Sequence, residues 1–170
     1  MSNTDSTQGL YSLSTKEIYT EAKSIFQDFF RNQTPLNTFK LSITLYHLME
    51  WIEQSEISND TAKRLVNELR SYEFYEILKT VANTSKHFHL TRKSSPSHDQ
   101  VVVEGFRIGQ SVMGERFGQV NLAIDFNSKE VWLREVFAYV LGKYADYFED
   151  SESIYPLENW KLVRLDASLK

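Results

Sequence analysis

The sequence predicts a mainly α-helical protein, a four-helix bundle with one inserted β-hairpin. Along most of the chain, apolar residues recur three or four positions apart, as on the buried face of an amphipathic helix. Over residues 120–126 the spacing changes to two, which is typical of a strand with one buried face. The 170 residues, 41% of them hydrophobic, suffice for one core. We therefore expect a flexible tail over residues 1–13 and a single domain over residues 14–170.

The first two helices are predicted from a capping signal and an apolar pattern. Ser14 and Glu17 have the spacing of a capping box, in which each side chain accepts a hydrogen bond from an otherwise unpaired amide. They predict a helix over residues 16–31, which Pro35 keeps from extending further. The segment "FKLSITLYHLMEWIEQ", residues 39–54, is apolar on nearly every side. It predicts a second helix in the centre of the bundle.

The third and fourth helices follow from the same periodicity. A third helix is predicted over residues 61–88, with Asn59 or Asp60 as its N-cap. An interruption near Ser71 remains an alternative. The last helix is predicted over residues 129–148, with large aliphatic and aromatic residues facing inward.

The inserted hairpin is predicted at about residues 100–127. Residues 100–109 are rich in β-branched side chains and can pair with the alternating segment 120–126 across a loop that contains glycines. Because an isolated hairpin is only marginally stable in water, this one must pack against the bundle or a partner.

Composition excludes several classes of function. The chain has no cysteine, which excludes disulfides, a thiol nucleophile and cysteine-bound zinc. The net charge of −4 argues against broad binding to a polyanion, although a local basic patch is still allowed. No apolar run is long enough to span a membrane and no export signal is visible, so a cytoplasmic location is expected. No phosphate-binding glycine loop or nucleophile elbow is present, and we expect no cofactor.

The end of the third predicted helix concentrates the residues that can carry chemistry. Histidine and basic side chains gather in and after "VANTSKHFHLTR", residues 81–92, and no acidic residue interrupts them. A histidine that moves a proton and a cation that stabilises phosphate charge are what metal-independent RNA cleavage requires. The candidate site consists of Lys79, Asn83, Lys86, His87, His89, Arg92 and Lys93, with Glu50 on the preceding helix.

The order of these segments along the chain resembles that of a known group of proteins. "LYHLMEWI", then "SYEFYEILKTVANTSKHFHLTR", then strands and an aromatic helix resemble a group of bacterial and phage proteins with an Ala-Asn-x-x-Lys-His motif, over roughly residues 36–148. The layout is also similar to the HEPN superfamily of four-helix proteins, which includes ribonuclease toxins and phage-defence effectors. The family's arginine and aspartate before Ala-Asn are Leu78 and Lys79 here. The missing arginine implies impaired cleavage, because the lysines of this site offer only a point charge, whereas an arginine gives a planar two-pronged contact.

The chemistry of RNA cleavage gives roles to five of the candidate residues. His87 would act as acid or base, Lys86 or Lys79 would supply the cation, and Asn83 would orient the imidazole or the phosphate. Glu50 would orient His87 or hold a lysine. HEPN-type sites are composed at a dimer cleft, so a homodimer is expected.

Other interpretations of the same residues stay open. A lysine, asparagine and histidine opposite an apolar stripe also describe an ordinary solvated helix edge. His47 and Glu50 have the spacing of two metal ligands on one helix face, but a histidine hydrogen-bonded to a neighbour is the preferred interpretation and no metal is expected.

Two functions are therefore predicted. The first is a small HEPN-like accessory protein in a toxin or phage-defence context that binds RNA or a protein partner and cleaves RNA weakly or not at all. The alternative is a non-catalytic helical module for interaction or dimerisation.

Overall fold

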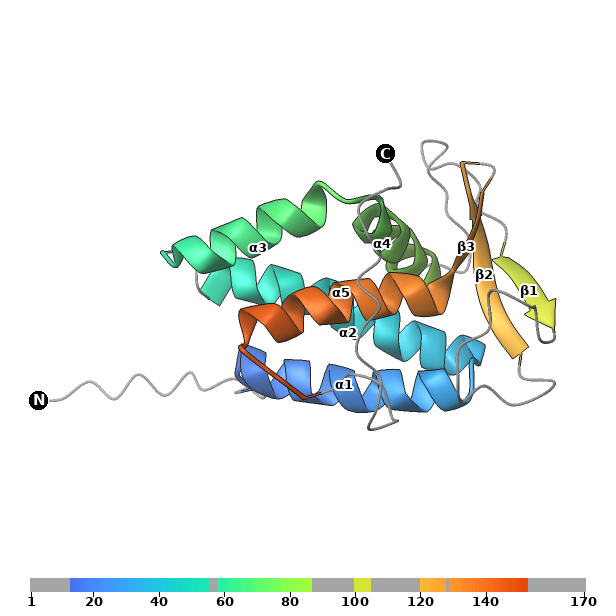
Figure 1. Cartoon of the computed structure of the whole chain (residues 1–170), viewed down its shortest axis with the longest axis horizontal. Coiled ribbons are helices and arrows are strands. Elements are labelled where there is room, and N and C mark those ends of the chain that lie inside the picture. The colour runs from blue at the N-terminus through green and yellow to red at the C-terminus, as the bar shows by residue number, and fades with distance from the viewer. Residues whose placement is uncertain (1–12, 56–57, 87–99, 105–119, 128, 153–170) are drawn as a thin grey trace, which may run out of the picture.

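The computed structural model describes residues 13–55, 58–86, 100–104, 120–127 and 129–152 (Figure 1). In this part of the chain, five helices lie beside one three-stranded antiparallel sheet. The elements are α1 (Thr15–Arg31), α2 (Pro35–Ser55), α3 (Asp60–Arg70), α4 (Glu73–Lys86), β1 (Gln100–Glu104), β2 (Val120–Phe126), β3 (Lys129–Trp132) and α5 (Leu133–Tyr147). The mainly helical class is confirmed. The predicted tail, apart from Leu13, lies outside the described residues.

Side-chain caps explain where the first helices begin. The predicted capping box is present: Ser14 Oγ accepts from the Glu17 amide, and Glu17 accepts from the Ser14 amide. α2 begins at Pro35, four residues earlier than predicted, because proline needs no hydrogen-bond partner at a first helical position. Thr34 Oγ1 accepts from the Asn37 amide and so caps this turn. Asn59 is the N-cap of α3, as one of the two predicted alternatives.

The predicted alternative of an interruption near Ser71 is confirmed: the region 61–88 holds two helices in its described part, so the described bundle has five helices rather than four. The helix α3 ends at its C-cap Ser71, whose hydroxyl donates to the Glu68 carbonyl. Continuing the helical period beyond Leu69 would bring Glu73 and Glu76 to the buried face. Because the helix ends and a new one begins at Glu73, the buried positions shift, and α4 buries Ile77, Leu78, Val81 and Ala82.

The sheet has one strand more than the predicted hairpin. The predicted pairing is confirmed for residues 100–104, with Val102 opposite Leu122 in an antiparallel β1–β2 ladder; residues 105–109 of the first predicted strand lie outside the described residues. The segment Lys129–Trp132, predicted as the first turn of the last helix, is instead β3 and pairs with β2. Asn127 makes the tight turn possible, because its φ of 52° lies in the left-handed region that asparagine tolerates.

Two helices form the centre of the molecule. α2 and α5 each contact all of the other described helices, and the sheet lies at one end of the bundle (Figure 1). The central position predicted for α2 is thus confirmed. The fully buried Tyr144 of α5 donates a hydrogen bond of 2.8 Å to the Leu45 carbonyl of α2. Phe29 and Phe137 meet edge to face, with ring centroids 5.0 Å apart.

A buried amide joins the sheet to the helices. Gln33, in the connection between α1 and α2, donates from Nε2 to Asn121 Oδ1 over 2.8 Å. Its Oε1 accepts from the Leu122 amide over 2.7 Å. Gln33 and Asn121 are both buried. The strands therefore pack against the bundle through a paired polar contact as well as through apolar side chains.

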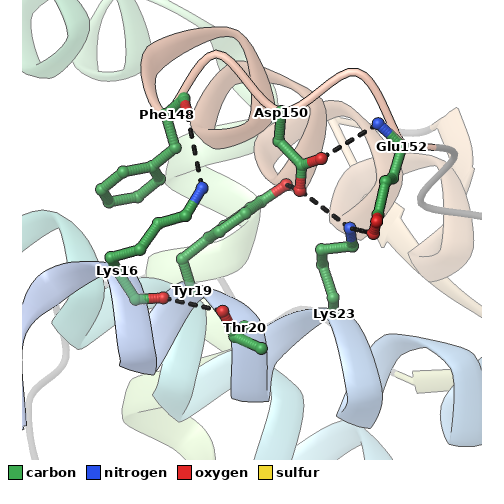
Figure 2. A network of polar contacts seen from close by, with 7 residues as sticks. All are labelled: Lys16, Tyr19, Thr20, Lys23, Phe148, Asp150 and Glu152. Atoms are coloured by element: carbon green, nitrogen blue, oxygen red, sulfur yellow. Dashed lines mark hydrogen bonds and ion pairs between the residues drawn. The ribbon is translucent and has the colours of Figure 1, made fainter.

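The segment that follows α5 contacts α1 through a network of ion pairs and hydrogen bonds (Figure 2). Asp150 Oδ2 accepts from Tyr19 Oη over 2.9 Å and from Lys23 Nζ over 2.8 Å. Burial alone would raise the pKa of Asp150, but these donors and the Glu152 amide outweigh it and lower the pKa to about 2. The Asp150 carboxyl is therefore ionised well above about pH 2, its pKa in the folded protein.

Candidate functional site

The polar edge of α4 carries the first of the predicted site residues. Lys79 and Asn83 lie one turn apart on the side of α4 opposite its buried stripe. Lys79 is exposed, and its Nζ lies 3.5 Å from Glu76 Oε2 on the same helix. Asn83 is half-buried. Lys86 ends α4, but its side chain lies outside the part of the structure that can be described.

The rest of the predicted cluster cannot be placed. His87, His89, Arg92 and Lys93 lie outside the described residues. The structure therefore brings together Lys79 and Asn83, and the wider site stays a prediction.

Glu50 contacts a histidine of its own helix. His47 Nδ1 lies 2.6 Å from Glu50 Oε2, so the histidine is hydrogen-bonded to a neighbour, as the preferred interpretation predicts. A carboxylate only accepts hydrogen bonds, so Nδ1 is the donor in this contact, which does not use Nε2. The two side chains are 36% and 35% exposed, which leaves the pair accessible to a partner.

Aromatic and ionic contacts hold this region of α2 in place. The rings of Tyr46 and Tyr75 stack across α2 and α4 with centroids 6.1 Å apart. Burial, and for Tyr46 also the Glu50 carboxylate, raises the pKa of both phenols, so both stay neutral at ordinary pH. Arg70, at the end of α3, binds Glu53 of α2 through two hydrogen bonds of 2.8 and 2.7 Å. Among the described residues, no three histidine or acidic side chains are grouped to hold a metal ion.

The surface of α2 turned away from the core carries a second candidate site, which the sequence analysis missed. We call it the outer face of α2; its residues recur every three or four positions and are not buried. They are Leu36, Phe39, Lys40, Ile43, His47, Glu50, Trp51 and Gln54. Leu36 is 59% and Phe39 39% exposed, whereas the opposite side of the helix is packed into the core.

A hollow of about 490 Å³ adjoins the outer face of α2 at its C-terminal end. Its walls include Trp51 and Gln54 from α2 and Leu13, which precedes α1. Leu13 is 54% exposed, so part of this apolar wall faces solvent. The outer face and the hollow together form a continuous surface that can bind another apolar surface or side chain.

The signal for this second site was present in the sequence. Leu36 was not assigned to the helix, because the predicted start was residue 39. Pro35 at the first helical position, preceded by a threonine cap, would have placed Leu36 one turn before Phe39 and Lys40 on one face.

None of the described helices has the length and apolar character needed to cross a membrane. No protein-family model matches the sequence, and the searches of curated proteins and of solved structures returned no match either.

Proposed function

We propose that the chain is a non-catalytic interaction module that binds a protein partner through the outer face of α2. The observation that carries this proposal is the exposure of Leu36 and Phe39 on the same face as Ile43 and Trp51. Single exposed apolar side chains are common on protein surfaces, but several on one helix face beside an apolar hollow are typical of an interface. The His47–Glu50 pair adds polar groups that can orient a partner.

Photo-crosslinking from the outer face of α2 tests this proposal. Phe39 is replaced by benzoylphenylalanine, which keeps an aromatic ring at an exposed position, in cells that produce the chain naturally. Irradiation is expected to give discrete crosslinked protein species. The matched control carries the same group at Arg64, an exposed position of α3, and should give none of these species. If position 39 gives no specific crosslink, the proposed interaction module is wrong.

A second candidate function is a HEPN-like accessory protein, in a toxin or phage-defence setting, that binds RNA and cleaves it weakly or not at all. It is favoured by the run of basic and histidine residues that follows α4 in the sequence, and by Lys79 and Asn83 on α4 itself. A single cation and a histidine at that point would serve phosphate binding and proton transfer.

Overexpression separates this second candidate from the first. An RNA-cleaving protein is expected to slow the growth of the host and to degrade labelled RNA. A His87→Ala variant with an unchanged circular dichroism spectrum should lose both effects, because His87 is the residue assigned to move the proton. Equal growth and intact RNA with the natural chain and the variant would contradict cleavage.

A further inference from the structure

The outer face of α2 has an apolar projection at one end and the hollow at the other. Leu36, in the first turn of α2, is the most exposed large hydrophobic side chain in the described part of the chain. The hollow lies beside Trp51 and Gln54 near the last turn. Leu36 and Gln54 are separated by five full helical turns and so point in the same direction, about 27 Å apart along the axis. A partner that covers Leu36 and fills the hollow at the same time must have a hollow opposite Leu36 and an apolar projection opposite Trp51.

A second copy of the chain has this opposite arrangement when its α2 runs antiparallel. A two-fold axis level with Leu45 places Leu36 of one copy opposite Gln54 of the other, where the hollow opens. The same axis places Ile43 opposite His47. Because a two-fold contact is self-complementary, Leu36 of each copy enters the hollow of the other copy.

The charges on this face agree with the antiparallel arrangement. Lys40 of one copy comes level with Glu50 of the other, so that a positive side chain approaches a negative one. A parallel arrangement would instead bring Lys40 near Lys40 and Glu50 near Glu50. Like charges brought together at an interface oppose association, so the charge pattern favours the antiparallel pair.

We propose that the outer face of α2 is the interface of an antiparallel homodimer in which Leu36 of each copy occupies the hollow beside Trp51 of the other. This inference rests on the proposed function and names its partner, a second copy of the chain. The interface places the two His47–Glu50 pairs close to the two-fold axis, each facing the other copy.

Sedimentation equilibrium of the purified chain tests the dimer. The natural chain is expected to show twice the monomer mass at high concentration. A Leu36→Asp variant should raise the dimer dissociation constant by about tenfold or more, because it puts a carboxylate into an apolar hollow. Leu36 is exposed and in a first helical turn, where a carboxylate is favourable, so this variant should fold normally.

Thr61→Asp is the matched control. It adds the same charge to the first turn of α3, at an exposed position away from the outer face of α2. Its dimer dissociation constant should be unchanged. A natural chain that stays monomeric at about 0.5 mM, or a Leu36→Asp variant that dimerises as well as the natural chain, overturns the inference.

Cysteine crosslinking tests the antiparallel register. The chain has no cysteine of its own, so an introduced pair can be read without background. A mixture of Ile43→Cys and His47→Cys chains should form a disulfide-linked dimer faster than either variant alone. Faster linkage of the Ile43→Cys variant with itself would overturn the antiparallel arrangement.

The outcomes also separate this inference from the proposed function. If the chain is monomeric in solution but crosslinks from position 39 to a different protein in cells, the homodimer is wrong and the interaction module is supported. A chain that neither dimerises nor crosslinks fails both.

Discussion

Replacement of Gln33 with alanine is expected to lower the free energy of unfolding by about 3 kcal/mol, because it leaves two buried polar groups without their partners. Gln33 accepts from the Leu122 amide and donates to Asn121 Oδ1, and it is only 5% exposed. An alanine side chain can do neither, and the space that it leaves is enclosed between the α1–α2 connection and β2. Urea unfolding followed by circular dichroism measures the loss.

Asn121→Ala is the graded control for this prediction. It removes the bond to Gln33 Nε2 but keeps the bond from the Leu122 amide to Gln33 Oε1. Its cost should therefore be smaller, about 1 to 2 kcal/mol. Hydrogen exchange at the Leu122 amide should be faster in the Gln33→Ala variant than in the Asn121→Ala variant. Equal exchange rates and equal losses would mean that the Gln33–Leu122 bond does not stabilise the fold.

The elements that the sequence predicts best are those with local signals. The capping box at Ser14 and the periodicity of residues 16–31 need no information from the rest of the chain, and α1 is found where they place it. The pairing of β1 with β2 follows from the alternation of residues 120–126 and the β-branched side chains of residues 100–109. Local hydrogen bonding and a regular buried face are sufficient for these elements.

The elements that were predicted incorrectly depend on neighbours that are distant in sequence or on short signals. Lys129–Trp132 falls within the last predicted helix, residues 129–148, directly before the apolar pattern that begins at Leu133. Trp132 instead pairs with Ala123 across β2 and β3, and both are buried there. A segment of four residues fits a helix turn and an edge strand equally well, so that the strand pairing decides between them.

The candidate site was predicted only in part for a similar reason. Periodicity identifies the apolar positions of α2 but does not tell which of them other helices cover. Leu45 and Leu48 are covered, whereas Leu36 and Phe39 are not. The contact between Glu50 and His47 agrees with their spacing, since residues three apart on a helix are neighbours, although the sequence did not identify Glu50 as the neighbour. Which apolar face stays open depends on tertiary packing, and the structure alone shows it.

Replacement of Asp150 with asparagine is expected to lower the free energy of unfolding by about 2 kcal/mol near neutral pH, since a lowered pKa in the folded state measures the stabilisation of the charged carboxylate. Asparagine keeps the shape and an acceptor oxygen, so the change removes mainly the charge that Lys23 and Tyr19 contact. Both Asp150 and Lys23 have side chains only 12% exposed, so that water screens this pair weakly. Thermal unfolding of the variant and of the natural chain gives the difference.

Glu152→Gln is the matched control, because Glu152 binds the same Lys23 Nζ at nearly the same distance, 2.9 Å against 2.8 Å for Asp150. Its side chain is 82% exposed, so its loss should cost less than about 0.5 kcal/mol. Equal losses for the two variants would contradict the importance of burial in this network.

The pH dependence gives an independent check on Asp150. Its folded pKa is lower than its unfolded pKa, so the unfolded chain takes up the proton first as the pH falls. The stabilisation is therefore complete above about pH 4 and is lost between about pH 4 and pH 2. The difference between the natural chain and the Asp150→Asn variant should shrink over this interval, whereas a difference that persists below about pH 2 would have to come from packing and not from the charge.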